Sequence, residues 1–200
     1  MTRVNPPYLA DVVGSFLRPK AVSEARAAFH KGEITREALT EVEDREIAKL
    51  VDKELANGLT AMTDGEFRRA FWHLDFLAAR GGIRHVPAEA WSVRFEGKQP
   101  KAETIVIADR LYFPEDHPFL DAFDRLKKIV NGMAPIKYTM PSPSMLHLIC
   151  CVREAHNSRL NCIRTMKKHF FGYRADLDRC REGALCPRLP LAAVRRHQLG

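Results

Sequence analysis

The sequence has no apolar run that approaches the roughly 18 residues of a membrane-spanning helix, which argues against a membrane protein. Its first ten residues contain Asn5, Pro6 and Pro7 in place of the apolar centre of a signal peptide, so we expect a cytoplasmic location. There is no internal repeat and no low-complexity segment. A content of 46% hydrophobic and 28% charged residues is that of an ordinary globular protein, which excludes disorder, collagen and coiled coil as descriptions of the whole 200-residue chain.

Cysteine is absent from residues 1–147, and charge is balanced there. This part contains 21 Lys+Arg and 21 Asp+Glu, whereas residues 148–200 contain 11 and 4, which accounts for the whole net charge of +7. The same tail holds every cysteine: Cys150, Cys151, Cys162, Cys180 and Cys186. None of these has the CxxC spacing of a zinc site, and His156 and His169 fit no zinc-finger pattern. We therefore treat residues 1–147 and the basic tail, residues 148–200, as separate parts.

Two helices are indicated near the start of the chain. The first is predicted over residues 21–30 and ended by Gly32, and a longer one follows a Thr35 cap. Apolar positions of the longer helix recur every three or four residues and predict one buried stripe: Leu39, Val42, Ile47, Leu50, Val51 and Leu55. Asn57-Gly58 supplies its left-handed stop.

Short apolar segments around these helices predict strands. Val12-Val13 is expected to be a buried strand, and residues 59–62 a second strand that follows the long helix. Strand, helix and strand form a βαβ unit, which implies a parallel sheet with a right-handed crossover. The remaining predicted elements are helices over residues 71–79 and 121–130, β-rich segments 94–96 and 104–108 that could pair as a hairpin, and a strand over 136–140.

Two predicted strand ends carry polar groups. In parallel α/β folds the chemistry gathers at the carboxyl ends of strands, and Gly14-Ser15 lies at one such end. Gly14 lets a ligand approach the backbone closely, and Ser15 adds a hydroxyl and an N–H. The alternative is that Gly-Ser simply turns the chain.

The second strand end is Asp64-Gly65-Glu66, which places two carboxylates beside a flexible glycine. Such carboxylates can accept hydrogen bonds from a substrate amine, bind a metal, or act as acid and base. The alternative is a solvated turn in which Arg68 and Arg69 are the salt partners. The residues alone leave these alternatives open.

Four motifs occur in an order that resembles the cobalamin-independent methionine synthase family, most closely its short single-barrel bacterial members. They are residues 12–19 (VVGSFLRP), 63–69 (TDGEFRR), 71–77 (FWHLDFL) and 140–147 (MPSPSMLH). The resemblance covers about residues 9–147 and implies an α/β fold, a (β/α)8 TIM barrel of the methionine synthase and uroporphyrinogen decarboxylase type. Such a barrel normally needs about 250 residues, so we expect a partial, truncated barrel in residues 1–147.

The resemblance also implies a chemistry, the transfer of a methyl group to the thiol of homocysteine. Gly14 and Ser15 match the residues that hold the amino-acid substrate, Glu66 matches the glutamate that receives its amino group, and Asp64 is expected to orient that loop. An ammonium group needs an anionic acceptor, which agrees with this assignment. The resemblance assigns no catalytic residue here. The methyl donor is expected to be methyltetrahydrofolate or a corrinoid protein.

Zinc is the cofactor that the resemblance implies. A neutral thiol is a poor nucleophile, and zinc held by Cys and His would deprotonate it at an open coordination position. The family's zinc ligands lie downstream of the matched motifs and have no counterpart here, so we expect the ligands to be absent from this chain and the chain alone to be inactive.

We interpret the tail as read out of frame and expect it to be poorly packed. Residues 185–199 (LCPRLPLAAVRRHQL), back-translated and shifted by one nucleotide, can spell a sequence resembling the family's next strand, GCRYLQLDDTNLA. An out-of-frame stretch of a GC-rich gene is rich in Arg, Pro, Ala and Cys, as this tail is. The alternative is a genuine, divergent basic tail.

Two other functions stay open. The basic tail could hold nucleic acid or an acidic partner, although the balanced charge of residues 1–147 argues against a nucleic-acid protein. A related barrel could act on another thiol substrate, because a fold alone does not determine chemistry. The observation that discriminates among these hypotheses is whether Ser15 and Glu66 converge on an amino-acid-sized pocket.

Overall fold

The computed structural model describes residues 11–87 and 103–153. The chain divides into two compact units, which we describe separately. The described part of the first unit comprises residues 11–70 and Asp121–Thr139, and that of the second comprises residues 71–87, 103–120 and 140–153. No helix of this described part is long and apolar enough to cross a membrane.

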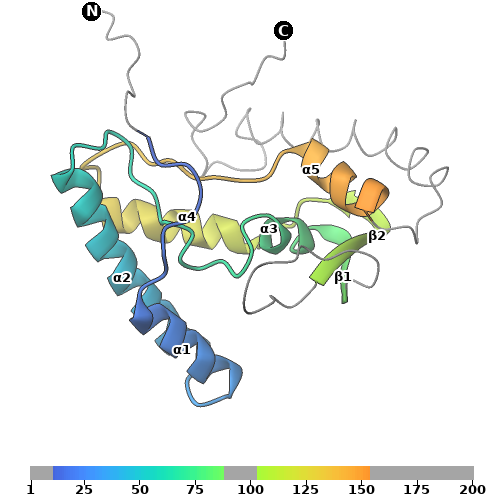
Figure 1. Ribbon diagram of the computed structural model, residues 1–200, viewed down its shortest axis with the longest axis horizontal. Helices are drawn as coiled ribbons and strands as arrows, with labels where there is room; N and C mark the ends of the chain where they lie inside the picture. Colours follow the sequence, from blue (N-terminus) through green and yellow to red (C-terminus); the bar gives the residue numbers. More distant parts are fainter. Residues whose placement is uncertain (1–10, 88–102, 154–200) are drawn as a thin grey trace, which may run out of the picture. The chain divides into compact units, whose positions relative to one another are not determined.

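The first unit begins with a pair of packed helices, α1 (Lys20–His30) and α2 (Arg36–Ala56), which lie side by side in Figure 1. The Thr35 side chain accepts a hydrogen bond from the Ala38 backbone N–H, so the predicted N-cap is confirmed. Gly58, at φ +74°, follows the last turn of α2 and confirms the predicted stop. The predicted apolar stripe is buried at Leu39, Ile47, Leu50 and Val51, and partly exposed at Val42 and Leu55.

Three carboxylates share the buried side of α2 with that stripe, and the apolar pattern did not indicate them. Glu43, Glu46 and Glu54 are 3%, 8% and 2% exposed. Buried carboxylates need partners to offset the loss of hydration. Glu43 and Glu54 are paired with groups from other segments, Arg26 and Thr63, whereas Glu46 is paired within α2, with Lys49 at 2.7 Å.

The predicted parallel sheet is represented in the described residues by a single bridge, between Met62 and Ile136. The Met62 N–H donates to the Pro135 carbonyl at 2.9 Å, and the Lys137 N–H donates to the Met62 carbonyl at 2.9 Å. Residues 59–62 and 136–140 are thus aligned in parallel without forming full strands. The prediction of a buried strand at Val12-Val13 is wrong, because no strand forms there and Val13 is 87% exposed.

Helix α4 (Pro118–Val130) follows the prediction but begins three residues earlier than expected. Asn131 and Gly132, at φ +47° and +78°, end it as predicted. Its Phe123 ring packs edge-on against Tyr138 at a centroid distance of 5.9 Å. This contact joins α4 to the segment that contains the Ile136 bridge.

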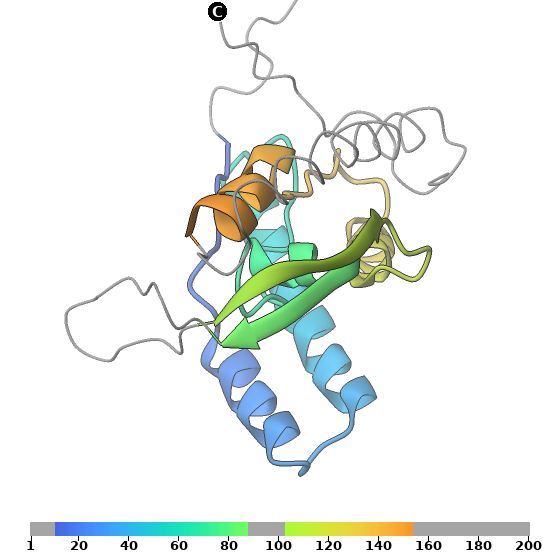
Figure 2. The same ribbon diagram turned by 90° about the vertical axis from the view of Figure 1, so that its right-hand side faces the viewer.

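The second unit contains the two-stranded antiparallel sheet of the described residues, β1 (Gly81–Pro87) and β2 (Glu103–Tyr112), shown in Figure 2. The predicted β-rich segment 104–108 lies in β2, but its partner is β1, whereas the predicted partner 94–96 lies outside the described residues. Helix α3 (Leu74–Ala78) is shorter than the predicted 71–79. The unit also contains α5 (Pro143–His147) and the π-helix η1 (Leu148–Arg153).

The second unit is organised around a buried histidine. His117 is 1% exposed, its Nε2 bonds to the Phe76 carbonyl at 3.1 Å, and its Nδ1 accepts from the Phe119 N–H at 3.2 Å. Its ring stacks on Phe113 at 4.7 Å. Because Nδ1 accepts, the proton of the neutral ring lies on Nε2.

The described residues thus form a mixed α/β structure with a two-stranded sheet and one parallel bridge. A partial barrel remains a prediction. Residues 154–200, most of the tail, lie outside the described residues, so the frameshift and poor-packing hypotheses also remain predictions.

Candidate functional site

A tight turn at residues 64–67 forms the centre of the candidate site in the first unit. The Phe67 N–H donates to the Asp64 carbonyl at 3.2 Å, and the two residues between them, Gly65 and Glu66, have φ of +60° and +58°. Positive φ at both central positions is the pattern of a type I′ turn. Asp64 Oδ1 accepts from the Glu66 N–H at 2.9 Å, which fastens the turn from within.

The turn is fitted closely against its surroundings. A Cβ at position 65 would lie 2.6 Å from Leu50 Cδ2 of α2, so both the backbone angle and the available space require glycine. The Gly65 carbonyl accepts from the Phe16 N–H at 3.1 Å. Through this bond, the segment that carries Gly14 and Ser15 lies beside the turn.

The Glu66 carboxylate is buried, with 3% of the residue exposed, and it accepts hydrogen bonds from three segments of the chain. The Ser15 hydroxyl donates to Oε2. On Oε1, the Thr139 hydroxyl donates at 2.8 Å and Arg69 Nη1 donates at 3.2 Å. The two residues predicted to hold one substrate, Ser15 and Glu66, are therefore in direct contact.

Arg69 is the cation of this site and is 2% exposed. Besides Glu66, its Nη1 reaches the Thr139 hydroxyl at 3.2 Å, and its Nη2 donates to the Thr139 carbonyl at 2.8 Å. Its guanidinium lies over the Tyr138 ring, 4.9 Å from the centroid, which is within cation–π range. The side chain is thus held on several sides.

Asp64 is the second buried carboxylate of the turn, at 3% exposure. Its Oδ2 has no hydrogen-bond partner among the described residues. Burial raises the pKa of Tyr138, and the negative charge of Asp64 raises it further. Tyr138 is therefore a neutral phenol at neutral pH.

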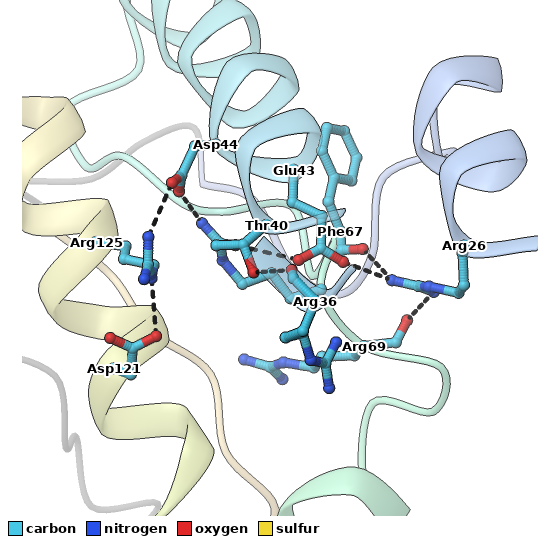
Figure 3. Close-up of polar contacts among 10 residues, drawn as sticks. Arg26, Arg36, Thr40, Glu43, Asp44, Phe67, Arg69, Asp121 and Arg125 are labelled. Carbon is cyan, nitrogen blue, oxygen red and sulfur yellow. Dashed lines mark hydrogen bonds and ion pairs between the residues drawn. The ribbon is translucent and has the colours of Figure 1, made fainter. Parts of the chain in front are cut away.

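An ion-pair network supports the turn from the helix side (Figure 3). Arg26 of α1 donates to the Phe67 carbonyl at 2.6 Å, to the Arg69 carbonyl at 3.0 Å and to Glu43 at 3.2 Å. Arg68 pairs with Glu43 at 3.1 Å and also with Asp44. These bonds fix the backbone on the carboxyl side of Glu66.

The amino side of the turn is fastened by Glu54. Its Oε2 accepts from the Thr63 N–H at 2.8 Å, and its Oε1 accepts from the Thr63 hydroxyl at 2.8 Å. Burial raises the pKa of Glu54, while the Thr63 hydrogen bonds act in the opposite direction. Helix α2 therefore holds both ends of the turn through its buried carboxylates.

An open groove of about 470 Å³ runs along α2 in the same unit. Its lining residues are Phe16, Leu17, Pro19, Glu46, Lys49, Leu50, Lys53, Glu54, Asn57, Leu59 and Phe67. Neither Ser15 nor Glu66 lines it. The contact between Ser15 and Glu66 is therefore distinct from this groove.

Of the predicted site residues, the structure joins Ser15 and Glu66 and places Asp64 within the same turn. Gly14, at φ +85°, has open space where a Cβ would point, so only its backbone angle favours glycine. The predicted roles in substrate binding remain predictions.

The alternative of a solvated turn is wrong, because Asp64 and Glu66 are buried. Of the two salt partners predicted for this turn, Arg69 is confirmed, because it pairs with Glu66. Arg68 instead pairs with Glu43 of α2. Arg69 and Thr139 were not predicted as site residues. The signal for Arg69 is its position three residues after Glu66, whereas no sequence signal distinguishes Thr139.

The residues that the structure describes do not fit a zinc centre. Across residues 11–87 and 103–153, no group of three or more His, Cys, Asp or Glu side chains could hold a metal ion. Cys150 is buried, and its thiol donates to the Ile105 carbonyl at 3.5 Å. We derive no chemical step through zinc.

Comparison with known proteins gives this mixed α/β structure a context. No family model matches the chain. It is 40% identical over 146 residues to the uncharacterized protein YxjG of Bacillus subtilis (strain 168), covering 73% of this chain and 38% of that protein. It is 42% identical over 141 residues to YxjH of the same organism, covering 70% and 36%. The chain thus spans well under half the length of these relatives.

A solved structure matches the chain with a sequence identity and coverage similar to those of the two Bacillus proteins. It is a protein from Listeria monocytogenes that carries the provisional name vitamin-B12-independent methionine synthase. The two share 40% sequence identity with a TM-score of 0.56, over 70% of this chain and 38% of that one. The first part of the chain is therefore similar to part of a methionine synthase-like protein.

Proposed function

We propose that this chain carries the amino-acid-binding part of a methyltransferase of the cobalamin-independent methionine synthase type. The expected acceptor is homocysteine, whose thiol would receive the methyl group, and the expected donor is methyltetrahydrofolate or a corrinoid protein. The similarity to the Listeria protein supports the family. The expected location is the cytoplasm.

The observation that carries the proposal is the contact between Ser15 and Glu66, 51 positions apart in sequence. Two short motifs that resemble the family's substrate-holding residues meet at a single carboxylate. An anionic group held by fixed hydrogen bonds is a suitable acceptor for a substrate ammonium group, because charge-assisted hydrogen bonds are the stronger ones. The exposed Ser15 lies on the side from which a ligand can approach.

We propose further that this chain alone does not complete the methyl transfer. Activation of a thiol needs a thiolate or a metal, and the described residues provide no metal-binding group. The chain's own contribution is then to bind and orient the amino acid. Purified chain mixed with homocysteine and methyltetrahydrofolate should form no methionine, and measurable turnover would contradict this part of the proposal.

Binding of the amino acid is the direct test. We expect L-methionine, the reaction product, to bind more tightly than 4-(methylthio)butanoate, which has the same skeleton without the amino group. A hydrogen bond to a charged group is worth about 1.5–3 kcal/mol, which corresponds to roughly ten-fold or more in affinity. Titration of ¹⁵N-labelled protein followed by NMR measures both ligands, even at millimolar affinity.

The matched variants are Glu66→Gln, which removes the charge at the site, and Glu37→Gln, which removes an exposed charge in the first turn of α2. Glu66→Gln should remove the preference for L-methionine, and Glu37→Gln should retain it. Equal affinity of the unaltered chain for the two ligands would overturn the proposal.

A further inference from the structure

We propose that Arg69 and Thr139 are positioning residues that hold one oxygen of Glu66, so that the other oxygen, together with the Ser15 hydroxyl, is offered to a single ammonium group. The inference rests on the proposed function and adds the reason for its selectivity. It assigns a task to two residues that the sequence motifs did not indicate.

One acceptor position of the Glu66 carboxylate is left open. A carboxylate has about four lone-pair sites, two on each oxygen. Oε1 of Glu66 receives the Thr139 hydroxyl and the Arg69 guanidinium, which fills it. Among the described residues, Oε2 receives only the Ser15 hydroxyl, which leaves one acceptor position on that oxygen.

A ligand can reach this acceptor position from the side of Ser15. Glu66 is buried, whereas Ser15 is exposed. Because the Ser15 hydroxyl uses its proton on Glu66, its own oxygen lone pairs can accept from a ligand. An ammonium group that arrives beside Ser15 can therefore donate to Ser15 Oγ and to Glu66 Oε2 at the same time.

Arg69 does not occupy that acceptor position itself, because its guanidinium is held elsewhere. Its Nη2 is bonded to the Thr139 carbonyl at 2.8 Å, and its guanidinium lies on the Tyr138 ring. Its backbone carbonyl is held by Arg26 at 3.0 Å. A guanidinium that is fixed in this way stays on Oε1, and a planar fork suits this role better than the flexible ammonium of a lysine.

The backbone of Glu66 adds an independent indication. A non-glycine residue at φ +58° costs about 1–2 kcal/mol relative to a right-handed conformation. Such strain persists where the surroundings determine the geometry closely, and it is concentrated at functional sites. A glycine would relieve the strain at position 66 but would remove the carboxylate.

The test measures the ratio of the affinities for L-methionine and 4-(methylthio)butanoate in variants of Thr139 and Arg69. Thr139→Val removes one hydroxyl at nearly constant volume, and Thr139→Ser restores it. We expect Thr139→Val to lower the affinity ratio of the two ligands roughly five-fold, less than the loss of a direct bond to the ligand would, because Thr139 acts through Glu66. Thr139→Ser should recover the ratio. Arg69→Lys should lower the ratio as well, because the flexible lysine ammonium lacks the planar fork that reaches Glu66 through Nη1 and the Thr139 carbonyl through Nη2.

A purely structural role gives a different result. If Thr139 and Arg69 only stabilise the fold, the variants weaken both ligands equally and the ratio stays at the value of the unaltered chain, which would overturn the inference. Thr40→Val, which removes an exposed hydroxyl bonded to the Arg36 carbonyl, is the control and should leave the ratio unchanged. If Arg69→Lys does not fold, Thr139→Val decides the question.

The same experiment separates the two proposals. Loss of the ratio in Glu66→Gln together with an unchanged ratio in Thr139→Val would leave the proposed function in place and overturn the positioning role. Absence of any preference in the unaltered chain would overturn the proposed function, and the positioning role with it.

Discussion

Glu54 accepts two hydrogen bonds from Thr63, one from the backbone N–H and one from the hydroxyl, each at 2.8 Å. This pair joins the last turns of α2 to the residue that precedes the Asp64–Glu66 turn. The carboxylate is 2% exposed, so its ionisation is coupled to folding. The same physical link between burial and titration appears in the second unit at His117.

Glu54 should make the first unit less stable as the pH rises. Burial raises the pKa of Glu54 above the value of 4.5 that applies to the unfolded chain. Its contribution is therefore fully present below pH 4.5 and is lost as the pH rises through the folded-state pKa. Glu54→Gln removes this pH dependence. In urea unfolding, the free energy of unfolding of the variant relative to that of the unaltered protein should therefore be higher at pH 7 than at pH 4. Glu41→Gln, at an exposed position of α2, is the control.

His117 should make the second unit less stable as the pH falls. Burial lowers the pKa of His117 below 6.5, and the Arg80 charge lowers it further, while the Phe76 carbonyl and Asp116 oppose this. The stability linked to the neutral ring is thus present above pH 6.5 and is lost as the pH falls through the folded-state pKa. His117→Asn should be less stable at pH 7.5, and its deficit should shrink by pH 5.5. A deficit that stays constant, as expected for His30→Asn at an exposed position, would contradict the prediction.

The left-handed backbone at Glu66 should make a glycine variant more stable than an alanine variant, the reverse of the usual order within a helix. Both Glu66→Ala and Glu66→Gly remove the carboxylate, but only glycine accepts φ +58° without strain. We expect the glycine variant to be more stable than the alanine variant by about 1 kcal/mol. At Lys49, an exposed position within α2, the order should be the normal one, with alanine more stable by about 1 kcal/mol. Thermal unfolding of the four variants measures both differences.

Asp44 should matter more for stability than Asp121, although both pair with Arg125. Asp44 also pairs with Arg68, whose side chain is 11% exposed, whereas the Asp121 side chain is 72% exposed. Loss of a partner to a mostly buried cation costs about 1–3 kcal/mol, and loss of an exposed pair costs less than about 1 kcal/mol. Denaturant unfolding of Asp44→Asn and Asp121→Asn should show this order, and equal losses would argue that the network is a surface feature.

The helices were predictable because local signals determine them. Thr35 supplies a cap, Gly58 supplies a stop, and the apolar spacing between them is regular. The buried Glu43 and Glu54 were not predictable, because their partners Arg26 and Thr63 come from other segments. A prediction from hydrophobic periodicity assigns a glutamate to the exposed face, because it contains no information on polar partners from other segments.

The candidate site divides in the same way. The motifs indicated Ser15 and Glu66, and their contact follows from the folded backbone. Thr139 is indistinguishable in sequence from any other threonine, since its role depends on the parallel bridge that aligns residue 136 with Met62. The pairing of β2 with β1 was not predicted, because β-rich composition does not specify which segments pair.

The separation of Glu66 and Thr139 by 73 residues has a consequence for biosynthesis. At about 5–20 residues per second, a ribosome delivers Thr139 roughly 4 to 15 seconds after Glu66. Helices α1 and α2 consist of local contacts and can pack during that interval, while the glutamate still lacks one of its hydrogen-bond donors. The nascent chain therefore exposes an unfinished polar turn beside a finished helical hairpin, and this turn closes only when the later segment leaves the exit tunnel.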